Sequence, residues 1–423
     1  KQFLDSGQAE HALSNLNLSG ISFEAADLSK ADLSAARLEG ARLLRARLID
    51  AVLDDADLQG ADLSHAVMLR VRARRANFTA ASLHRTQWDG ADLAGAVWRA
   101  TDLAGADFHR STLNGPAIAA AVLRDAAFHQ VDFAGLDLSG RDLSGCTFDG
   151  CRFTDTTLSG ARLDRTTFRD CDLAAAKLAG AQLDRTVFER GTLAGADLSG
   201  SRLVYVQSSD TVLDGLDLRK AQLHRVNITP ADLRTVALAG ATLDRCNLAA
   251  AMLAGTVLDG VVLRDCHLAE ADLTGVRWAN MVLDGTVFLS AKLVGAHLTA
   301  SSARNAVFTG ADLTDALLDG VQAPGCNLAA AMLTGTTIRH AVMTGSVWTG
   351  TQAIGARVSD CRLALADFAY ARLDEAAFFG CDLTDADLHG VERASSRWIR
   401  CTLVRTRQTD RHRLFAETWT PPD

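Results

Sequence analysis

Two histidines are the first residues whose spacing suggests chemistry. His109 and His129 lie twenty residues apart, and two imidazoles on one surface can begin a transition-metal site. No third ligand accompanies them at a matching spacing, so a solvated pair is the simpler interpretation. The sequence contains no GxxxxGK[ST] phosphate loop, no HExxH zinc motif and no GxSxG nucleophile motif. We therefore predict no catalytic residue, no bound metal and no cofactor.

The nine cysteines raise the question of disulfides or metal binding. They are separated by multiples of five residues, and Cys361, Cys381 and Cys401 follow one another at intervals of twenty. No CxxC pair occurs, and side chains stacked in parallel hold their β-carbons too far apart for a relaxed disulfide. Buried thiols behave as small apolar groups. We predict structural, reduced cysteines, which are typical of a reducing compartment.

A five-residue period organises the whole chain. A large apolar residue, mostly leucine or phenylalanine, recurs every five residues from Leu13 to Leu403 without insertion or deletion. A small residue, most often alanine, precedes it by two places, and glycine often fills the fifth place. The large residue is missing at six places, which are Ala73, Ser208, Ala303, Ala323, Ala353 and Arg393. The unit reads A-D-L-x-G, which fits neither the helical period nor a plain alternating strand.

This unit predicts a short strand that ends in a corner. The small and the large residue point inward on either side of one outward residue, as in three residues of strand. Glycine in the fifth place favours a corner, because it adopts positive φ at little cost. Repeated corners wind the chain into coils that bury their inner faces against one another. An aromatic column at intervals of twenty predicts four repeats per coil and an interior ladder rather than a ligand groove: Trp88, Phe108, Phe128, Phe148, Phe168 and Phe188.

Two runs carry a family resemblance, ADLSKADLSAARLEGARL from Ala26 and GADLAGAVWRATDLAGADF from Gly90. They resemble the pentapeptide-repeat family, whose pattern is A(D/N)Lxx. The resemblance implies an all-β fold, a right-handed quadrilateral β-helix, here with about 20 coils. We expect a lead-in at residues 1–12, the repeat solenoid at 13–405, and a C-terminal cap and tail at 406–423. In the last segment a short helix would begin near Asp410 and plug the solenoid with Leu414, Phe415 and Trp419.

Composition narrows the class of protein. The chain has 423 residues, 48% hydrophobic content and a formal net charge of −8, which excludes a disordered chain and argues against a general nucleic-acid binder. Its longest uncharged run, from Gly320 to Ile338, contains proline and glycines, so we predict no membrane span. We expect a bacterial cytoplasmic protein, with delivery by a secretion system as a sub-case.

Three departures from the pattern are candidate functional features. Arg141 stands where a small inward residue is expected, so either the strand bulges and releases it, which we favour, or a buried partner satisfies it. Outward places that are usually polar are apolar around a weakly charged stretch, which predicts a protein interface formed by Val282, Val287, Val307, Val342 and Val347. Clustered arginines predict a patch for an acidic partner or phosphates, with a solvated wall as the alternative: Arg70, Arg72, Arg74 and Arg75.

We therefore expect a non-catalytic scaffold for protein–protein interactions that binds another protein or itself, with no direct nucleic-acid partner and no small-molecule substrate. The chain begins at Lys1 rather than at a methionine, so we expect the repeat portion of a larger bacterial protein. The resemblance suggests a secretion-system accessory, adaptor or effector. It also supplies the alternative, a DNA-mimicking protein that binds gyrase as an inhibitor or protector, which the interleaved arginines disfavour.

Overall fold

The computed structural model describes residues 13–113, 118, 120–256, 258 and 261–419. The lead-in predicted at residues 1–12 lies outside the described residues. Within the chain, two compact units are distinguished, Lys1–Asp217 and Leu218–Asp423. Each unit is built from the same five-residue repeat, so the repeat is described first.

The repeat folds as an inward, outward, inward sequence followed by a turn. In one representative five-residue repeat, Ala91 and Leu93 are buried and Asp92 between them is half-buried. Parallel bridges join residues twenty apart, from Asn17↔Arg37 in the first unit to Asp387↔Arg407 in the second. Four repeats therefore complete one coil, and the fold is the parallel β-solenoid that the sequence predicted.

Backbone hydrogen bonds hold each coil to the next. The N–H of Leu28 donates to the carbonyl of Arg47 over 2.8 Å, and the N–H of Arg47 donates to the carbonyl of Ala26 over 2.9 Å. Many sides also close a turn, as when Ala31 N–H donates to the carbonyl of Leu28 over 3.1 Å. Adjacent coils thus satisfy each other's backbone polar groups. Most of the inward side chains of the coils are buried.

Most corner residues have positive φ, and many of them are not glycine. Gly145 has φ of 72°, but Arg165, twenty residues later, has 58° and Leu365 has 61°. The expectation that glycine sets the corner is therefore too narrow, because the coil imposes this conformation on leucine and arginine as well. The strain is of the order of 1–2 kcal/mol for a residue with a β-carbon, and ladder bonds on both sides of the corner hold it in place.

The interior of the first unit contains the predicted aromatic ladder. Trp88 and Phe108 stack with ring centroids 5.6 Å apart, and Phe168 and Phe188 stack at 5.2 Å. All six rings of the column are at most 3% exposed. A second pair, Phe133 and Phe153, meets this column edge to face. The column is packed core and offers no open aromatic groove.

Strands of two or three residues form on some sides of the coils. In the first unit one sheet has the order β1, β3, β5, β6, β7, β9 and β11, and smaller pairs are β2 with β4 and β8 with β10. Their bounds are β1 Gln87–Asp89, β2 Asp92–Leu93, β3 Asp107–His109, β4 Thr112–Leu113, β5 Ala127–His129, β6 Thr147–Asp149, β7 Thr167–Arg169, β8 Gln182–Asp184, β9 Val187–Glu189, β10 Arg202–Val204 and β11 Gln207–Ser209.

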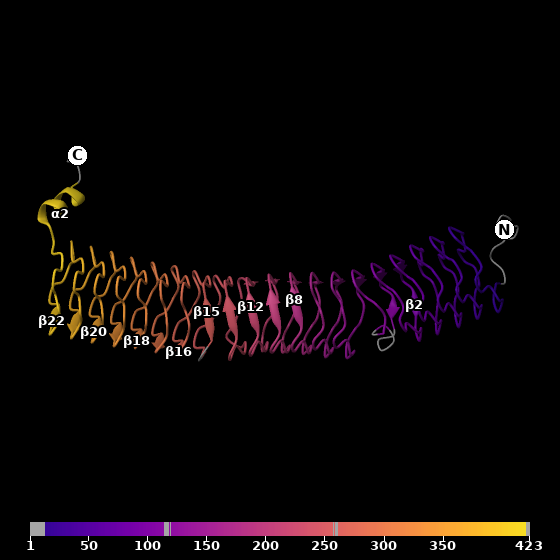
Figure 1. Cartoon of the computed structure of the whole chain (residues 1–423), viewed down its shortest axis with the longest axis horizontal. Helices are drawn as coiled ribbons and strands as arrows, with labels where there is room; N and C mark the ends of the chain where they lie inside the picture. The colour runs from indigo at the N-terminus through magenta and orange to yellow at the C-terminus, as the bar shows by residue number, and fades with distance from the viewer. Residues whose placement is uncertain (1–12, 114–117, 119, 257, 259–260, 420–423) are drawn as a thin grey trace. The chain divides into compact units, whose positions relative to one another are not determined.

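In the second unit, β12, β14 and β15 form one sheet and β16 to β22 form another in sequence order, toward the yellow end of Figure 1. The bounds are β12 Gln222–His224, β13 Asn227–Ile228, β14 Thr242–Asp244, β15 Val262–Arg264, β16 Arg277–Ala279, β17 His297–Thr299, β18 Leu317–Asp319, β19 Thr337–Arg339, β20 Arg357–Ser359, β21 Ala377–Phe379 and β22 Arg397–Ile399.

The predicted C-terminal helix is present as α2, Arg411–Thr418, and Asp410 caps it by accepting from the N–H groups of His412 and Arg413. The predicted apolar plug is wrong, because Phe415 is 70% exposed and Trp419 is 56% exposed. Instead, Glu417 attaches the helix by polar contacts, which leaves Leu403 of the last coil 41% exposed.

Candidate functional site

The uncharged wall, defined as Val282, Val287, Val307, Val342 and Val347, lies on two adjacent sides of the second unit. Val287 is bridged to Val307, and Asn327 connects Val307 to Val347 in the same column. On the neighbouring side, Gln322 is bridged to Val342. All five valines are half-buried, since the ladder packs their β-carbons while their outer faces remain at the surface.

Charge is scarce along this wall. Between Gly320 and Ala356 the only formally charged residue is Arg339, and its guanidinium pairs with Asp319 over 2.9 Å. Leu289 is 43% exposed and Met332 is 39% exposed on nearby sides. Val342 and Val347 lie in this weakly charged stretch, whereas Val282, Val287 and Val307 precede it. The β-branched shape of all five also suits a strand.

The arginine cluster is largely neutralised by aspartates of neighbouring coils. Each guanidinium lies within 2.7 Å of a carboxylate, in the pairs Arg70–Asp50, Arg72–Asp54, Arg74–Asp92 and Arg75–Asp55. The Arg75 guanidinium holds the pKa of Asp55 below its ordinary value, mainly through their hydrogen bond. An acidic partner would have to compete with these internal carboxylates, so the arrangement favours a solvated, self-paired wall.

Arg141 keeps its place in the coil. Its N–H donates to the carbonyl of Leu138, and its carbonyl accepts from Arg162, so the favoured bulge does not form. The guanidinium is half-buried and donates to the carbonyl of Ala121. By the pattern of the other coils, the carbonyl of Ala121 would accept a hydrogen bond from the backbone N–H of Asp142. Among the described residues, no backbone hydrogen bond joins Ala121 and Asp142. The guanidinium of Arg141 therefore replaces one of the backbone hydrogen bonds between coils.

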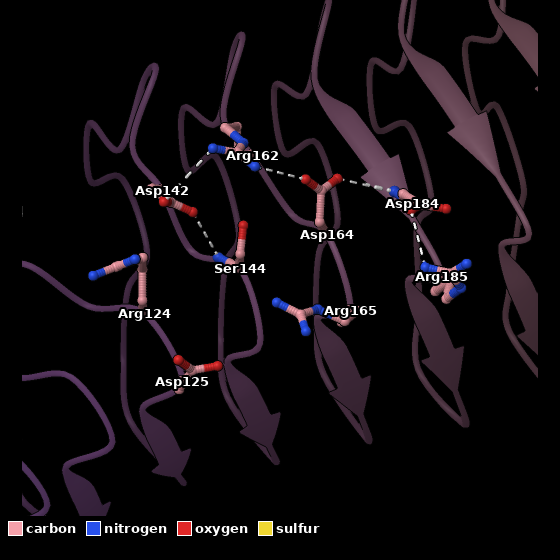
Figure 2. A pocket seen from close by; sticks show the side chains of 9 residues that line it. All are labelled: Arg124, Asp125, Asp142, Ser144, Arg162, Asp164, Arg165, Asp184 and Arg185. Carbon is pink, nitrogen blue, oxygen red and sulfur yellow. Dashed lines mark hydrogen bonds and ion pairs between the residues drawn. The ribbon is translucent and has the colours of Figure 1, made fainter.

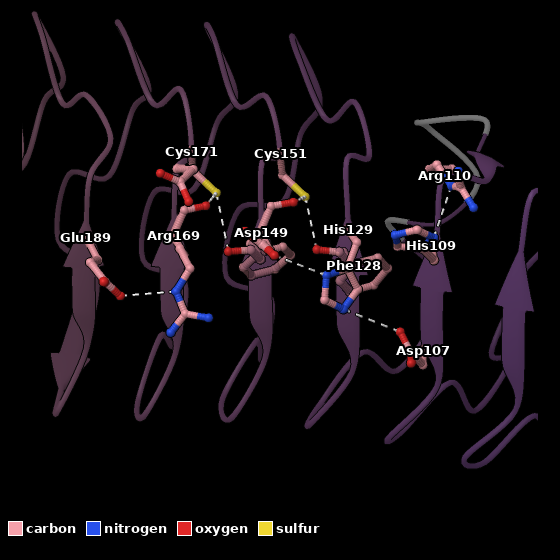
Figure 3. Close-up of polar contacts among 12 residues, drawn as sticks. Asp107, His109, Arg110, Phe128, His129, Asp149, Cys151, Arg169, Cys171 and Glu189 are labelled. Carbon is pink, nitrogen blue, oxygen red and sulfur yellow. Dashed lines mark hydrogen bonds and ion pairs between the residues drawn. The ribbon is translucent and has the colours of Figure 1, made fainter.

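The histidine pair lies on strands β3 and β5 and is held by carboxylates (Figure 3). His109 Nδ1 is 2.9 Å from Asp89, and the His129 ring lies 3.4 Å from Asp149 and 3.6 Å from Asp107. The two rings stand 5.5 Å apart. Within the described ranges, no three His, Cys, Asp or Glu side chains are grouped to hold a metal ion. The side chains form a row along neighbouring coils rather than a converging site.

The cysteines occupy the small inward place and bond to backbone carbonyls. The thiol of Cys151 donates to the carbonyl of Phe128 over 3.2 Å, just as the hydroxyl of Thr156 donates to Phe133 over 2.8 Å (Figure 3). Burial raises the pKa of Cys146 to about 12. Cys146 therefore stays protonated, and thiols at this place substitute for hydroxyls in hydrogen bonds to the backbone, which agrees with the structural role predicted for them.

A polar hollow on the first unit was missed at the sequence level (Figure 2). It has a volume of about 360 Å³ and is lined by Arg124, Asp125, Asp142, Ser144, Arg162, Asp164, Arg165, Asp184 and Arg185. The hollow adjoins the backbone hydrogen bond that Arg141 replaces. The available signal was the corner column Gly145, Arg165, Arg185, in which a residue without a side chain precedes two arginines at intervals of twenty.

No helix in the described part of the chain is both long and apolar enough to cross a membrane.

Comparisons with known proteins agree on the repeat. Residues 121–198 match a family described as Pentapeptide repeat region. The family Pentapeptide repeats (8 copies) matches residues 12–43, 31–68, 56–93, 81–115, 193–229, 231–268, 262–299, 291–329, 311–350, 349–385 and 361–392. No curated protein matches the chain.

Several solved structures are similar. Full-length QnrB1, a plasmid-mediated fluoroquinolone resistance protein, is 17% identical over 50% of this chain and 84% of its own, with a TM-score of 0.24. HetL, a pentapeptide repeat protein involved in heterocyst differentiation regulation from the cyanobacterium Nostoc sp. strain PCC 7120, is 18% identical over 66% and 88%, at 0.13. A pentapeptide repeat protein from the Arabidopsis thaliana thylakoid lumen is 28% identical over 25% and 70%, at 0.12. These TM-scores support no argument, and only the repeat matches bear on relationship.

Proposed function

Since this chain belongs to the pentapeptide-repeat family, we propose that it is a non-catalytic scaffold that binds another protein through the uncharged wall. The observation that carries the proposal is the set of five half-buried outward valines on two adjacent sides. Two of them, Val342 and Val347, lie in the stretch from Gly320 to Ala356, whose one charged side chain is already paired. Exposed apolar side chains lose little on desolvation, and burying them against a partner is favourable.

The charges elsewhere support a scaffold rather than a DNA mimic. A protein that competes for a DNA site needs a sustained negative surface. Here aspartates alternate with cations that bind them, as where Arg152 pairs with Asp132 and Arg190 pairs with Asp170. We take a component of a bacterial secretion apparatus as the first partner to test and gyrase as the second.

The test is a pull-down from bacterial lysate with the whole chain and a Val287→Asp/Val307→Asp variant. We expect a partner that binds the parent protein and is lost with the variant, because two carboxylates would have to be buried in the interface. Val67→Asp is the matched control, since Val67 is a half-buried outward valine in the corresponding column of the first unit. An identical set of bound proteins, and an unchanged oligomer size, would count against this surface.

Gyrase is tested separately by a supercoiling assay with purified enzyme. We expect no effect at micromolar concentrations of the protein. Inhibition or protection at such concentrations would instead favour the DNA-mimic alternative.

A further inference from the structure

Four corner arginines form the same ion pair with an aspartate, and the corner beside the polar hollow lacks this pair. At four corners, an arginine binds through two nitrogens the aspartate that stands twenty residues earlier in the same column, at distances of 2.6–3.0 Å. The pairs are Arg70–Asp50, Arg75–Asp55, Arg190–Asp170 and Arg405–Asp385. Where an aspartate stands one coil below a corner arginine, the two side chains therefore pair.

Arg165 is a corner arginine without that carboxylate. The residue twenty places earlier is Gly145, and the residue twenty places later is Arg185. Among the residues that the structure describes, no hydrogen bond or ion pair engages the guanidinium of Arg165. Figure 2 shows this side chain extending from its own coil toward that of Ser144. Unlike those four arginines, Arg165 therefore has no aspartate of its own column below it.

The hollow lies beside Arg165 and also borders the carboxylate of Asp125. Gly145 contributes no side chain, and a β-carbon there would lie 2.1 Å from Oδ1 of Asp125, so the position cannot be filled without displacing that carboxylate. At about 360 Å³, the hollow falls at the lower end of the range of about 300–1,000 Å³ that small-molecule sites occupy. On its floor, the hydroxyl of Ser144 is buried and makes no hydrogen bond of acceptable geometry within the described ranges.

The hollow is lined by four arginines and four aspartates, but these charges are unevenly paired. Asp142 accepts from the N–H of Ser144 at 3.1 Å. The Arg162 guanidinium lies 3.1 Å from Asp164 and 3.9 Å from Asp142, and Arg185 lies 3.4 Å from Asp184. The lining residues outside these pairs are two arginines, Arg124 and Arg165, and one aspartate, Asp125. Two stacked arginines at 165 and 185 also repel each other, and an anion between coils would relieve this repulsion.

We propose that this hollow is a binding site for an oxyanion, either a phosphate or a carboxylate group, with Arg165 as its principal ligand. The bound oxygens take the place that an aspartate takes below the other corner arginines. The fork of a guanidinium binds two oxygens of either group, which gives the site its geometry. The proposal is independent of the uncharged wall, which lies on the other unit.

Isothermal titration of the whole chain with inorganic phosphate, and separately with acetate, tests the proposal. We expect saturable binding of at least one probe at low ionic strength, and the two dissociation constants show which group the site prefers. Arg165→Gln should weaken binding about tenfold or more, because a charge-assisted hydrogen-bond pair is lost. Arg85→Gln is the matched control: Arg85 stands in the same corner column with His65, not glycine, twenty residues earlier.

A second variant tests the site without changing net charge. Asp125→Ala/Gly145→Asp removes the obstructing carboxylate and supplies one beneath Arg165, so the internal pair should form and binding should be lost. Circular dichroism confirms that each variant is folded. Absence of saturation with both probes, equal binding by Arg165→Gln and Arg85→Gln, or full binding by the double variant would each overturn the proposal.

Discussion

Replacing Phe128 with alanine tests how much the aromatic ladder contributes to stability. The Phe128 ring is fully buried. It stacks on Phe108 at 5.4 Å and on Phe148 at 5.3 Å, and it meets Phe133 edge to face at 5.2 Å. Phe288 of the second unit is the comparison, since it is equally buried but stacks only on Phe308, at 4.8 Å.

The magnitude follows from these contacts. Truncation of a buried phenylalanine to alanine costs about 3–5 kcal/mol through lost transfer energy and the cavity that remains. Each aromatic pair adds about 0.5–1.5 kcal/mol beyond its buried area. Phe128 has two more ring partners than Phe288, so we expect Phe128→Ala to lower the free energy of unfolding by about 1–3 kcal/mol more than Phe288→Ala does.

Urea unfolding followed by tryptophan fluorescence measures both variants, because Trp88 and Trp98 report on the first unit and Trp278 and Trp348 report on the second. Phe128→Leu is the control, since it keeps most of the volume and removes the ring contacts alone. Equal losses for Phe128→Ala and Phe288→Ala would refute the reasoning and show that cavity formation alone governs the interior.

Two further predictions concern a corner and the C-terminal helix. Leu365 has φ of 61° and is 62% exposed, so Leu365→Gly should raise the free energy of unfolding by about 0.5–1 kcal/mol, the relief of strain less the entropy that glycine loses; an unchanged or lower thermal midpoint would show that the corner is unstrained. Hydrogen bonds from Tyr370 and Arg413 lower the pKa of Glu417 from 4.5 to about 2. Its contribution to α2 attachment is therefore complete above pH 4.5 and lost as pH falls through about 2. Hydrogen exchange at the α2 amides should rise over that interval in the parent, whereas Glu417→Gln should show high exchange already at neutral pH, and indifference of α2 to both changes would contradict the attachment.

Most of the fold could be predicted from the five-residue period of the sequence. Because large apolar residues recur without a single insertion, the inward places, the twenty-residue register and the aromatic stack from Trp88 to Phe188 could be predicted together. The burial of most of the cysteines could also be predicted, because they share the small inward place of the repeat. A strict repeat leaves few alternatives, because a shift of one residue would turn each leucine outward.

The details that escaped prediction depend on side-chain contacts between coils. The pairing of Arg70 with Asp50 was implicit in the register, yet the cluster looked like a free basic patch when only neighbours in sequence were considered. Arg141 was expected to leave the coil, whereas its long side chain reaches a carbonyl one coil away. The hollow at Gly145 depends on an absent side chain, which no residue-type motif describes.

Once the coils have formed, the backbone hydrogen bonds between them would hold the molecule together even if the chain were cut at a corner. At the corner of Ala175, the N–H of Ala175 donates to Ala194 in the next coil, while the N–H of Lys177 donates to Thr156 in the preceding one. A chain cut between these two residues would leave each new end tied to a different neighbour. Nicked molecules would therefore stay assembled in native conditions and separate only on unfolding, and a corner could accept inserted residues for the same reason.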